Sequence, residues 1–226
     1  APMQNIGAYG TELTDVFVEL EAIERSTGKL HTFDRDACDF GYRSSVFKTS
    51  KRNQYLISSI TLRLSRRPEV NLSYGGLKDY LAENGIHEPD IHQVSEAVIE
   101  IRQSKLPDWH KYGNAGSFFK NPIVSDDAFQ ALAGRTSLAE NEIPHYPAGE
   151  GQIKVPAGWL IQQAGWKGHR EGAVGCWPKQ ALVIVNYGGA SGADILNFAR
   201  RIRDDVHQKY GIRLYPEVNL IGMPQE

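Results

Sequence analysis

Cysteine, a surplus of one charge and long apolar runs are all scarce in this sequence. Its two cysteines, Cys38 and Cys176, stand far apart among 226 residues and form no CxxC pair. This spacing excludes a CxxC zinc site and a disulfide framework, and isolated thiols are typical of a reducing compartment. We therefore expect two free thiols and a cytoplasmic protein.

The balance of charges argues against a nucleic-acid partner. The chain has 25 Lys and Arg against 27 Asp and Glu, which gives a net charge of −2. Proteins that bind nucleic acids carry a basic surplus on one face. We interpret the short cluster of Arg63, Arg66 and Arg67 as a solvated strand end.

Signals of membrane insertion, secretion and metal binding are absent as well. No apolar run approaches the ~20 residues that a spanning helix needs, and no charged-then-apolar leader opens the chain. The spacing of His110, His145 and His207 does not suit metal ligands, so we expect no metal. Because the chain begins at Ala1 with a segment typical of a protein interior, we expect an N-terminal piece to be missing from this sequence.

Alternating polarity predicts three strands in the first part of the chain. Apolar and polar residues alternate over 13–24, a Ser-Thr-Gly-Lys turn follows at 26–29, and residues 31–33 can return beside the first strand. A third alternating run covers residues 54–64. This part of the chain is therefore predicted to be antiparallel and β-rich.

Helices and further strands are predicted beyond residue 90. Asp90 suits the N-cap of a helix over 91–103, which Pro107 prevents from continuing. The other predicted elements are helices from Ser125 through Ala133, at 157–164 and at 193–210, and strands at 180–186 and 212–221. A β-rich part followed by a mixed part predicts the α+β class.

The segment GNAGSFFKNP combines features that neither a surface turn nor a core strand explains alone. Gly113 and Gly116 suit the close approach of a ligand, whereas Phe118 and Phe119 suit a core. Ser117 between them belongs to no GxSxG elbow, so a triad nucleophile is not indicated. A serine that donates a proton needs no base beside it in its ground state.

Further stretches carry candidate binding residues, each with an ordinary structural alternative. The glycine-rich QNIGAYG loop at 4–10 either lets its backbone approach a ligand or is a plain turn. Arg43 either pairs with a carboxylate or phosphate, or stacks on Tyr42 at the surface. Tyr74, before two glycines, either closes over a ligand on a flexible loop or marks a turn.

Two more candidates lie near helix and strand ends. Arg102 and Lys105 are three residues apart at a helix end, where they either clamp a diphosphate or complement the helix dipole. Glu217 lies in the predicted terminal strand and faces either solvent or a pocket. In a pocket, partial burial would raise its pKa and keep the carboxyl group protonated.

In this order, the motifs resemble those of the UDP-N-acetylenolpyruvoylglucosamine reductase family. The matching strings are QNIGAYG, FGYR, SYG, RQSKLPD, GNAGSFFKNP, PAGWLIQQAGWKG, QALVIVN and YPEVNLIG, which together span essentially the whole chain. The loop with Tyr74 is similar to that of the family's tyrosine-bearing type. The resemblance implies that about 100 family residues precede this chain.

A fold and a domain organisation follow from the resemblance. It implies the C-terminal half of a PCMH-type FAD-binding α+β domain at 1–106, followed by an α+β substrate-binding domain at 107–211. Residues 212–226 would be a terminal strand that returns to the flavin-binding region. The implied flavin contacts are Ile6, Gly7 and Ala8.

The implied activity is NADPH-dependent reduction of UDP-N-acetylglucosamine enolpyruvate to UDP-N-acetylmuramate, a step of peptidoglycan precursor synthesis. FAD would carry hydride from NADPH to the enolpyruvyl group. Arg43 and a protonated Glu217 would stabilise the negative charge that follows, and Ser117 would protonate the α-carbon. The implied substrate contacts are Tyr74, Lys105, Asn121, Gln163 and Arg102.

Two other functions compete with this one. A non-catalytic module that binds a UDP-sugar would use the same substrate contacts without the redox step. A flavin-dependent oxidase would share the FAD-binding fold, but it would not need a serine proton donor. For the reductase we expect a monomer without nucleic-acid or membrane partners.

Overall fold

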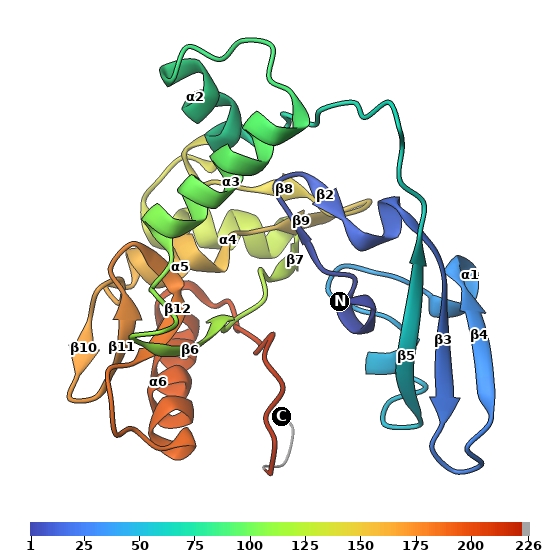
Figure 1. Ribbon diagram of the computed structural model, residues 1–226. Helices are drawn as coiled ribbons and strands as arrows, with labels where there is room; N and C mark the ends of the chain where they lie inside the picture. Colours follow the sequence, from blue (N-terminus) through green and yellow to red (C-terminus); the bar gives the residue numbers. More distant parts are fainter. Residues whose placement is uncertain (223–226) are drawn as a thin grey trace. The chain divides into compact units, whose positions relative to one another are not determined.

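The structure is a computed structural model that describes residues 1–222 (Figure 1). The chain forms two compact units, Ala1–Arg102 and Gln103–Glu226, and the boundary falls within helix α3 (Ile91–Lys105). Both units contain helices and antiparallel sheets, so the expected α+β class is confirmed.

A three-stranded antiparallel sheet in the first unit confirms the predicted hairpin and third strand. Strand β3 (Phe17–Glu24) lies between β4 (Leu30–Asp34) and β5 (Tyr55–Leu62), as Figure 1 shows. Gly28, at a φ of 71°, permits the tight connection from β3 to β4. Because side chains alternate between the faces of a strand, every second residue of β3 can enter a core.

The core of this sheet lies on one face. Leu20 and Ala22 of β3 are fully buried there, together with Phe33 of β4. The short helix α1 (Arg35–Cys38) and the 3₁₀ turn η3 (Val46–Lys48) contribute the side chains that cover them.

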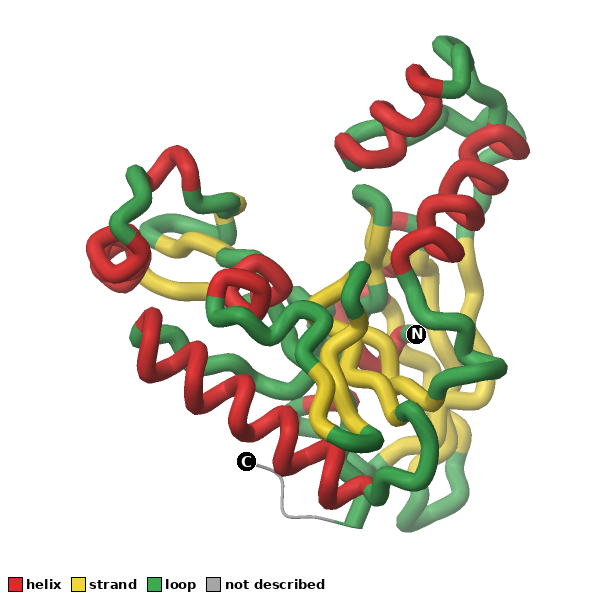
Figure 2. The backbone as a smooth tube through the Cα atoms, turned by 90° about the vertical axis from the view of Figure 1, so that its left-hand side faces the viewer, coloured by secondary structure: helices red, strands yellow, loops and turns green. Residues whose placement is uncertain are grey.

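Two helices of the first unit pack against each other around a smaller apolar cluster. Leu77 and Leu81 of α2 (Gly75–Glu83) pack with Ala97 and Ile101 of α3, and Figure 2 shows the two helices side by side. The Asp90 carboxylate accepts hydrogen bonds from the N–H groups at positions 92 and 93, which confirms the predicted N-cap of α3. Tyr74 lies at the end of an irregular segment, directly before α2, and its closure over a ligand stays a prediction.

The second unit contains a four-stranded antiparallel sheet. Its order is β10 (Arg170–Glu171), β11 (Val174–Trp177), β12 (Gln180–Asn186) and β6 (Gly113–Ser117). Strand β12 was predicted from its continuous apolar run. Its consecutive residues Val183, Ile184 and Val185 are all buried, so both faces of the strand are covered there. Strand β6 forms one edge, so its glycine-rich backbone is exposed.

A second small sheet and two helices fill out this unit. The polar stretch 134–156, for which no element was predicted, contributes β8 (Tyr146–Pro147) and β9 (Gln152–Lys154). Strand β9 lies between β8 and β7 (Ile123–Ser125) and pairs with both. The predicted helices are confirmed as α4 (Asp126–Thr136), capped by Ser125, and α5 (Ala157–Gln163).

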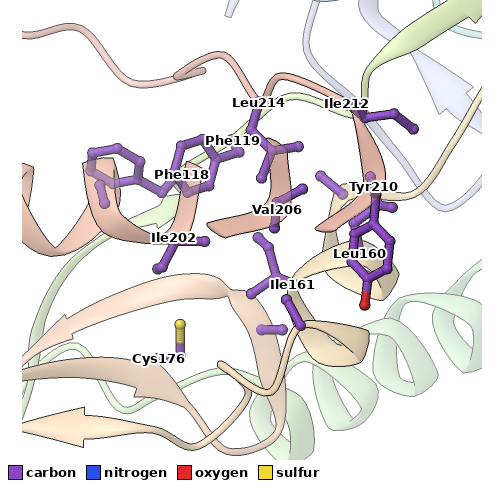
Figure 3. Packing of buried hydrophobic residues seen from close by; sticks show 14 of the residues in the cluster. Phe118, Phe119, Leu160, Ile161, Cys176, Ile202, Val206, Tyr210, Ile212 and Leu214 are labelled. Atoms are coloured by element: carbon purple, nitrogen blue, oxygen red, sulfur yellow. The ribbon is translucent and has the colours of Figure 1, made fainter. Parts of the chain in front are cut away.

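Helix α6 (Gly192–Tyr210) provides the largest single contribution to the core of the second unit. Ser191 caps its start and Gly211, at a φ of 73°, ends it, so the helix predicted at 193–210 is confirmed. Ile202 and Val206 are fully buried in the cluster of Figure 3, which also contains Phe118 and Phe119.

The prediction of a terminal strand at 212–221 is wrong, because these residues do not form a regular strand. Residues 212–220 are irregular, with a bend at 217–218, apart from an isolated antiparallel bridge between Pro216 and Phe119. Proline lacks an N–H and interrupts a regular ladder at that point. Residues 223–226 of the expected strand lie outside the described part of the chain.

Both cysteines are free, as expected from their spacing, and the structure buries both. Burial raises the pKa of the Cys176 thiol to about 12, and burial beside Asp34 raises that of Cys38 to about 11. Both thiols are therefore protonated at neutral pH and behave as small apolar side chains. Within residues 1–222, no helix is long and apolar enough to cross a membrane.

Candidate active-site residues

A small hairpin organises the predicted site residues of the first unit. Strands β1 (Gly7–Ala8) and β2 (Thr11–Glu12) pair antiparallel across a two-residue turn. The turn residues Tyr9 and Gly10 have φ values of 54° and 83°, so both are left-handed, as in a type I′ hairpin turn. The QNIGAYG motif is thus a defined hairpin rather than a plain loop.

Gly7 is required by close packing in this hairpin. A Cβ atom at Gly7 would lie 2.7 Å from Cγ of Glu12 and 2.8 Å from the carbonyl oxygen of Thr11. A larger residue would therefore push the two strands apart. The side chains of Ile6 and Ala8, on either side, are exposed.

Arg43 is fastened to this hairpin rather than extended into solvent. Its Nη2 donates to the carbonyl oxygen of Gly7 at 2.6 Å, and Nη1 donates to that of Asn5 at 3.5 Å. Nη1 also lies 3.9 Å from a carboxylate oxygen of Glu12, and the guanidinium lies 5.3 Å from the Tyr42 ring centroid. The side chain is only 18% exposed, so the surface alternative is wrong while the contact with Tyr42 is present.

The turn of the hairpin contacts two more predicted residues. The rings of Tyr9 and Tyr74 meet edge to face with centroids 5.0 Å apart, and the Tyr9 hydroxyl shares a hydrogen bond with the Arg102 side chain. Burial raises the pKa of Tyr9, and Tyr74 raises it further, while Arg102 opposes both effects. The hydroxyl of Tyr9 is therefore neutral at pH 7.

The first unit therefore gathers Arg43, Tyr74 and Arg102 on one hairpin that also carries the predicted flavin contacts. Exposed apolar side chains at Ile6 and Ala8, with a glycine between them, fit one edge of a flat aromatic ring. Sequence reasoning missed three residues of this arrangement, namely Asn5, Tyr9 and Glu12. All three lie in or next to the QNIGAYG motif, so the motif itself was the available signal.

Ser117 ends strand β6, directly before the buried pair of phenylalanines. It lies opposite Val183 of β12, at an irregularity in the register of the two strands. The Phe118 N–H donates to the carbonyl of Leu182 at 2.8 Å, and the two phenylalanine rings pack edge to face. The core thus holds the backbone beyond Ser117, while Ser117 itself is exposed.

Of the two glycines before Ser117, only Gly116 has a backbone conformation that requires glycine. Gly116 has a φ of 74°, in the left-handed region that favours glycine. Gly113 has no such φ, and a Cβ there would meet Asn186 at 3.6 Å, an ordinary contact. The backbone therefore demands glycine at 116, whereas the structure gives no such reason at 113.

The terminal segment pairs Glu217 with Phe118, the residue after Ser117. The N–H of Glu217 donates to the carbonyl of Phe118 at 2.8 Å, and the N–H of Lys120 donates to the carbonyl of Tyr215 at 3.0 Å. These bonds pair the residues after Ser117 with those around Glu217, which is half-buried. Two of the three predicted catalytic residues thus lie on adjacent backbone segments of one unit.

Asn121 has a structural role that the sequence did not reveal. Its Oδ1 accepts a hydrogen bond at 2.9 Å from the N–H of Ala157, the first residue of α5. Pro156 at the N-cap provides no side-chain acceptor, so Asn121 takes the place of a cap from another segment. Ala157 is fully buried, which makes water a poor substitute for this bond.

We expect Asn121→Ala to lower the free energy of unfolding by about 1–3 kcal/mol, because a buried N–H loses its acceptor. Asn121→Asp retains the acceptor oxygen and should unfold at nearly the parent denaturant concentration. If both variants unfold like the parent, the cap is not a significant contribution. A raised KM in the Asp variant alone would mark a separate contact with an anionic ligand.

Lys105 and Gln163 are both exposed, and they lie at the ends of two different helices. Lys105 is the last residue of α3, where a cation also complements the helix dipole. Gln163 ends α5, six positions beyond the helix start that Asn121 caps, which is about 9 Å at 1.5 Å per residue. Asn121 and Gln163 are therefore at opposite ends of one helix. Their common role in nucleotide binding stays a prediction.

Among residues 1–222, no three His, Cys, Asp or Glu side chains are grouped closely enough to hold a metal ion. The candidate chemistry of the described residues therefore consists of a guanidinium, a carboxyl group, a hydroxyl and an exposed apolar hairpin. These groups suit recognition of an anion, proton donation and contact with a flat ring.

Comparison with known proteins points to one family. A family model described as "UDP-N-acetylenolpyruvoylglucosamine reductase, C-terminal domain" matches residues 108–221. UDP-N-acetylenolpyruvoylglucosamine reductases from Pseudomonas aeruginosa and Flavobacterium johnsoniae are 50% and 47% identical over 97% of the chain. The chain spans 63% and 64% of those proteins, less than two thirds of their length.

A solved structure agrees at the level of the fold. The crystal structure of UDP-N-acetylenolpyruvylglucosamine reductase from Thermus caldophilus superposes with a TM-score of 0.58 at 22% identity. The match covers 97% of this chain and 58% of that one. On these sequence matches, the chain belongs to the UDP-N-acetylenolpyruvoylglucosamine reductase family.

Proposed function

We propose that the chain is the substrate-protonating part of an FAD- and NADPH-dependent reductase. The substrate is UDP-N-acetylglucosamine enolpyruvate and the product is UDP-N-acetylmuramate, a precursor of peptidoglycan. The observation that carries the proposal is the backbone hydrogen bond from Glu217 to Phe118, which joins the segment of Glu217 to the residue that follows Ser117. In this proposal, residues 1–106 belong to the flavin-binding domain, 107–211 bind the substrate, and 212–226 return to the flavin-binding region.

The proposed chemistry adds a hydride and a proton across the enolpyruvyl double bond. A bound flavin supplies the hydride, which the terminal carbon of the substrate receives. Electron density then builds at the neighbouring carbon and its carboxylate. Arg43 stabilises that charge, because fixed donors aimed at a developing anion lower the barrier, and Glu217 is assigned to the same end of the substrate.

Ser117 completes the reaction by giving its hydroxyl proton to the α-carbon. Its position at the exposed end of β6 allows a substrate to reach the hydroxyl, while the buried phenylalanines hold the backbone still. A proton donor needs such a fixed geometry, because catalysis depends on orientation at hydrogen-bond distance. Bulk water has no fixed direction of approach and would not define a single stereocentre.

Substrate binding is assigned to polar residues of both units. Lys105 and Arg102 provide cations for the diphosphate, and Tyr74 provides a hydroxyl for it. Asn121 and Gln163 are assigned to the nucleotide end. The edge contact of Tyr9 with Tyr74, and its hydrogen bond with Arg102, support the idea that these two act together.

Two titrations test this function against the runner-up, a non-catalytic module that binds a UDP-sugar. FAD is titrated into the purified protein of full family length carrying this sequence, and the flavin absorption is followed. NADPH oxidation is then measured with and without UDP-N-acetylglucosamine enolpyruvate. Flavin binding with substrate-dependent NADPH oxidation supports the reductase. Tight binding of the UDP-sugar without any flavin binding supports the module and contradicts the reductase.

A further inference from the structure

Asn5 is a buried polar residue that the proposed chemistry does not use. Its side chain belongs to a residue that is 1% exposed, and it makes three hydrogen bonds. Nδ2 donates to a Glu12 carboxylate oxygen at 2.8 Å and to the Gly41 carbonyl at 3.3 Å. Oδ1 accepts from the Thr14 N–H at 3.0 Å. The carboxamide thus connects three segments that are separate in sequence.

The partners of Asn5 are also the partners of Arg43. Glu12 places one carboxylate oxygen on Asn5 and the other 3.9 Å from the Arg43 guanidinium. The main-chain carbonyl of Asn5 accepts directly from Arg43, at 3.5 Å. Gly41, which accepts from the Asn5 side chain, stands two residues ahead of Arg43 in a tight turn closed by pairing with Ser44.

The backbone around this network has little freedom to adjust. Asn5 and Arg43 both have left-handed φ values, 42° and 52°. Asparagine adopts this region more readily than most residues, whereas arginine needs support from its surroundings. Gly7 stands too close to Glu12 for even a Cβ, so the hairpin cannot move inward to replace lost bonds.

We propose that Asn5 is a positioning residue that sets the orientation of the Arg43 guanidinium through Glu12 and the Gly41 turn. The consequence for catalysis rests on the proposed function of Arg43. The inference that Asn5 orients the guanidinium does not depend on that function, because it is drawn from the contacts above. Because Gly7 accepts from Arg43, the same network ties the arginine to the exposed edge formed by Ile6 and Ala8.

The decisive variant is Asn5→Asp, which keeps shape, the left-handed preference and the bond from Thr14. It loses both donor bonds and places two carboxylates at the 2.8 Å distance of the present bond to Glu12. We expect amide hydrogen exchange to accelerate by about tenfold or more in residues 41–45. The amides of β3 should exchange as in the parent. Asn84→Asp is the matched control, because Asn84 is exposed and bonds only locally to the Tyr80 carbonyl.

A second substitution provides the rescue. In Asn5→Asp with Glu12→Gln, the new amide donates to the new carboxylate, so the bond between positions 5 and 12 is restored in reverse while the bond to the Gly41 carbonyl stays lost. Exchange in residues 41–45 should return to within about threefold of the parent. Exchange that is unchanged in Asn5→Asp, or accelerated equally in the double variant, would overturn the positioning role.

Kinetics separate this role from the proposed function. In the full-length protein, we expect kcat for substrate reduction to fall by about tenfold in Asn5→Asp and to recover in the double variant, with flavin reduction by NADPH changed by less than about twofold. If exchange accelerates as expected while kcat is unchanged, Asn5 still positions Arg43, but Arg43 has no part in the reaction. That outcome contradicts the proposed function and leaves the positioning role intact.

Discussion

Replacing Ser117 by alanine is expected to lower the rate of substrate reduction by about 10²–10³-fold or more, because the α-carbon would lose the proton donor of the proposed reaction. Ser117 is exposed and its backbone is held by neighbouring residues, so the fold should be retained. Stopped-flow absorbance separates the two half-reactions in the full-length protein. Flavin reduction by NADPH should proceed at the parent rate, and reoxidation by the substrate should be slow.

Two further variants make this result specific. Ser117→Cys retains a proton donor of similar size and should recover part of the rate. Ser58→Ala, at an exposed position of β5, should leave both half-reactions unchanged. An equal loss of both half-reactions in Ser117→Ala would contradict the proton-donor role, since NADPH needs no proton from this serine.

Arg43→Lys is expected to lower kcat/KM by about 10²-fold, although it preserves the charge. Lysine has one ammonium group and cannot reproduce the planar fork with which Arg43 contacts the carbonyls of Gly7 and Asn5. The cation would therefore leave the hairpin, and the developing carboxylate charge would lose a fixed partner. Steady-state kinetics with varied substrate give kcat and KM separately.

A matched control comes from another arginine of the first unit. Arg25 donates to the Asn53 carbonyl on an exposed surface, so Arg25→Lys should have kinetics within about twofold of the parent. If Arg43→Lys also stays within twofold, the guanidinium geometry does not matter for the reaction. A loss confined to KM would instead assign Arg43 to binding in the ground state.

The longer helices of the fold could be predicted from the sequence because their signals are local. The apolar stripe of α6 repeats over five turns, and Ser191 and Gly211 mark its two ends. Strand β12 was equally clear from its apolar run. Each signal depends on residues within one window, so no long-range contact had to be known.

Elements with weak local signals were missed. Strand β6 consists of Gly, Asn, Ala and Ser, which have little preference for strands, and it forms because β12 offers a partner. Strands β8 and β9 are two and three residues long, within a polar stretch that contains prolines and glycines. Helix α2 begins with two glycines, which disfavour a helix, and packing of Leu77 and Leu81 stabilises it.

The candidate site residues also divide into those with local sequence signals and those without. Ser117 was singled out because the glycines and phenylalanines around it are local clues. The network of Asn5, Glu12 and Arg43 was not foreseen, because Arg43 is 38 positions from Asn5. Asn121 also bonds across 36 positions, to Ala157. Side-chain partners at such separations follow from the fold and leave no pattern in a single sequence.

The pairing of Phe118 with Glu217 also has a consequence for the order of folding. About 100 residues separate the two, and closing a loop of that length costs about 4 kcal/mol of chain entropy. Forming such a distant contact lowers the free energy only after the intervening β12 and α6 have packed. Because the Glu217 segment follows β12 and α6 in the sequence, it is also synthesised after them. The pairing at Phe118 is therefore expected to form late, after most of the core of the second unit has packed.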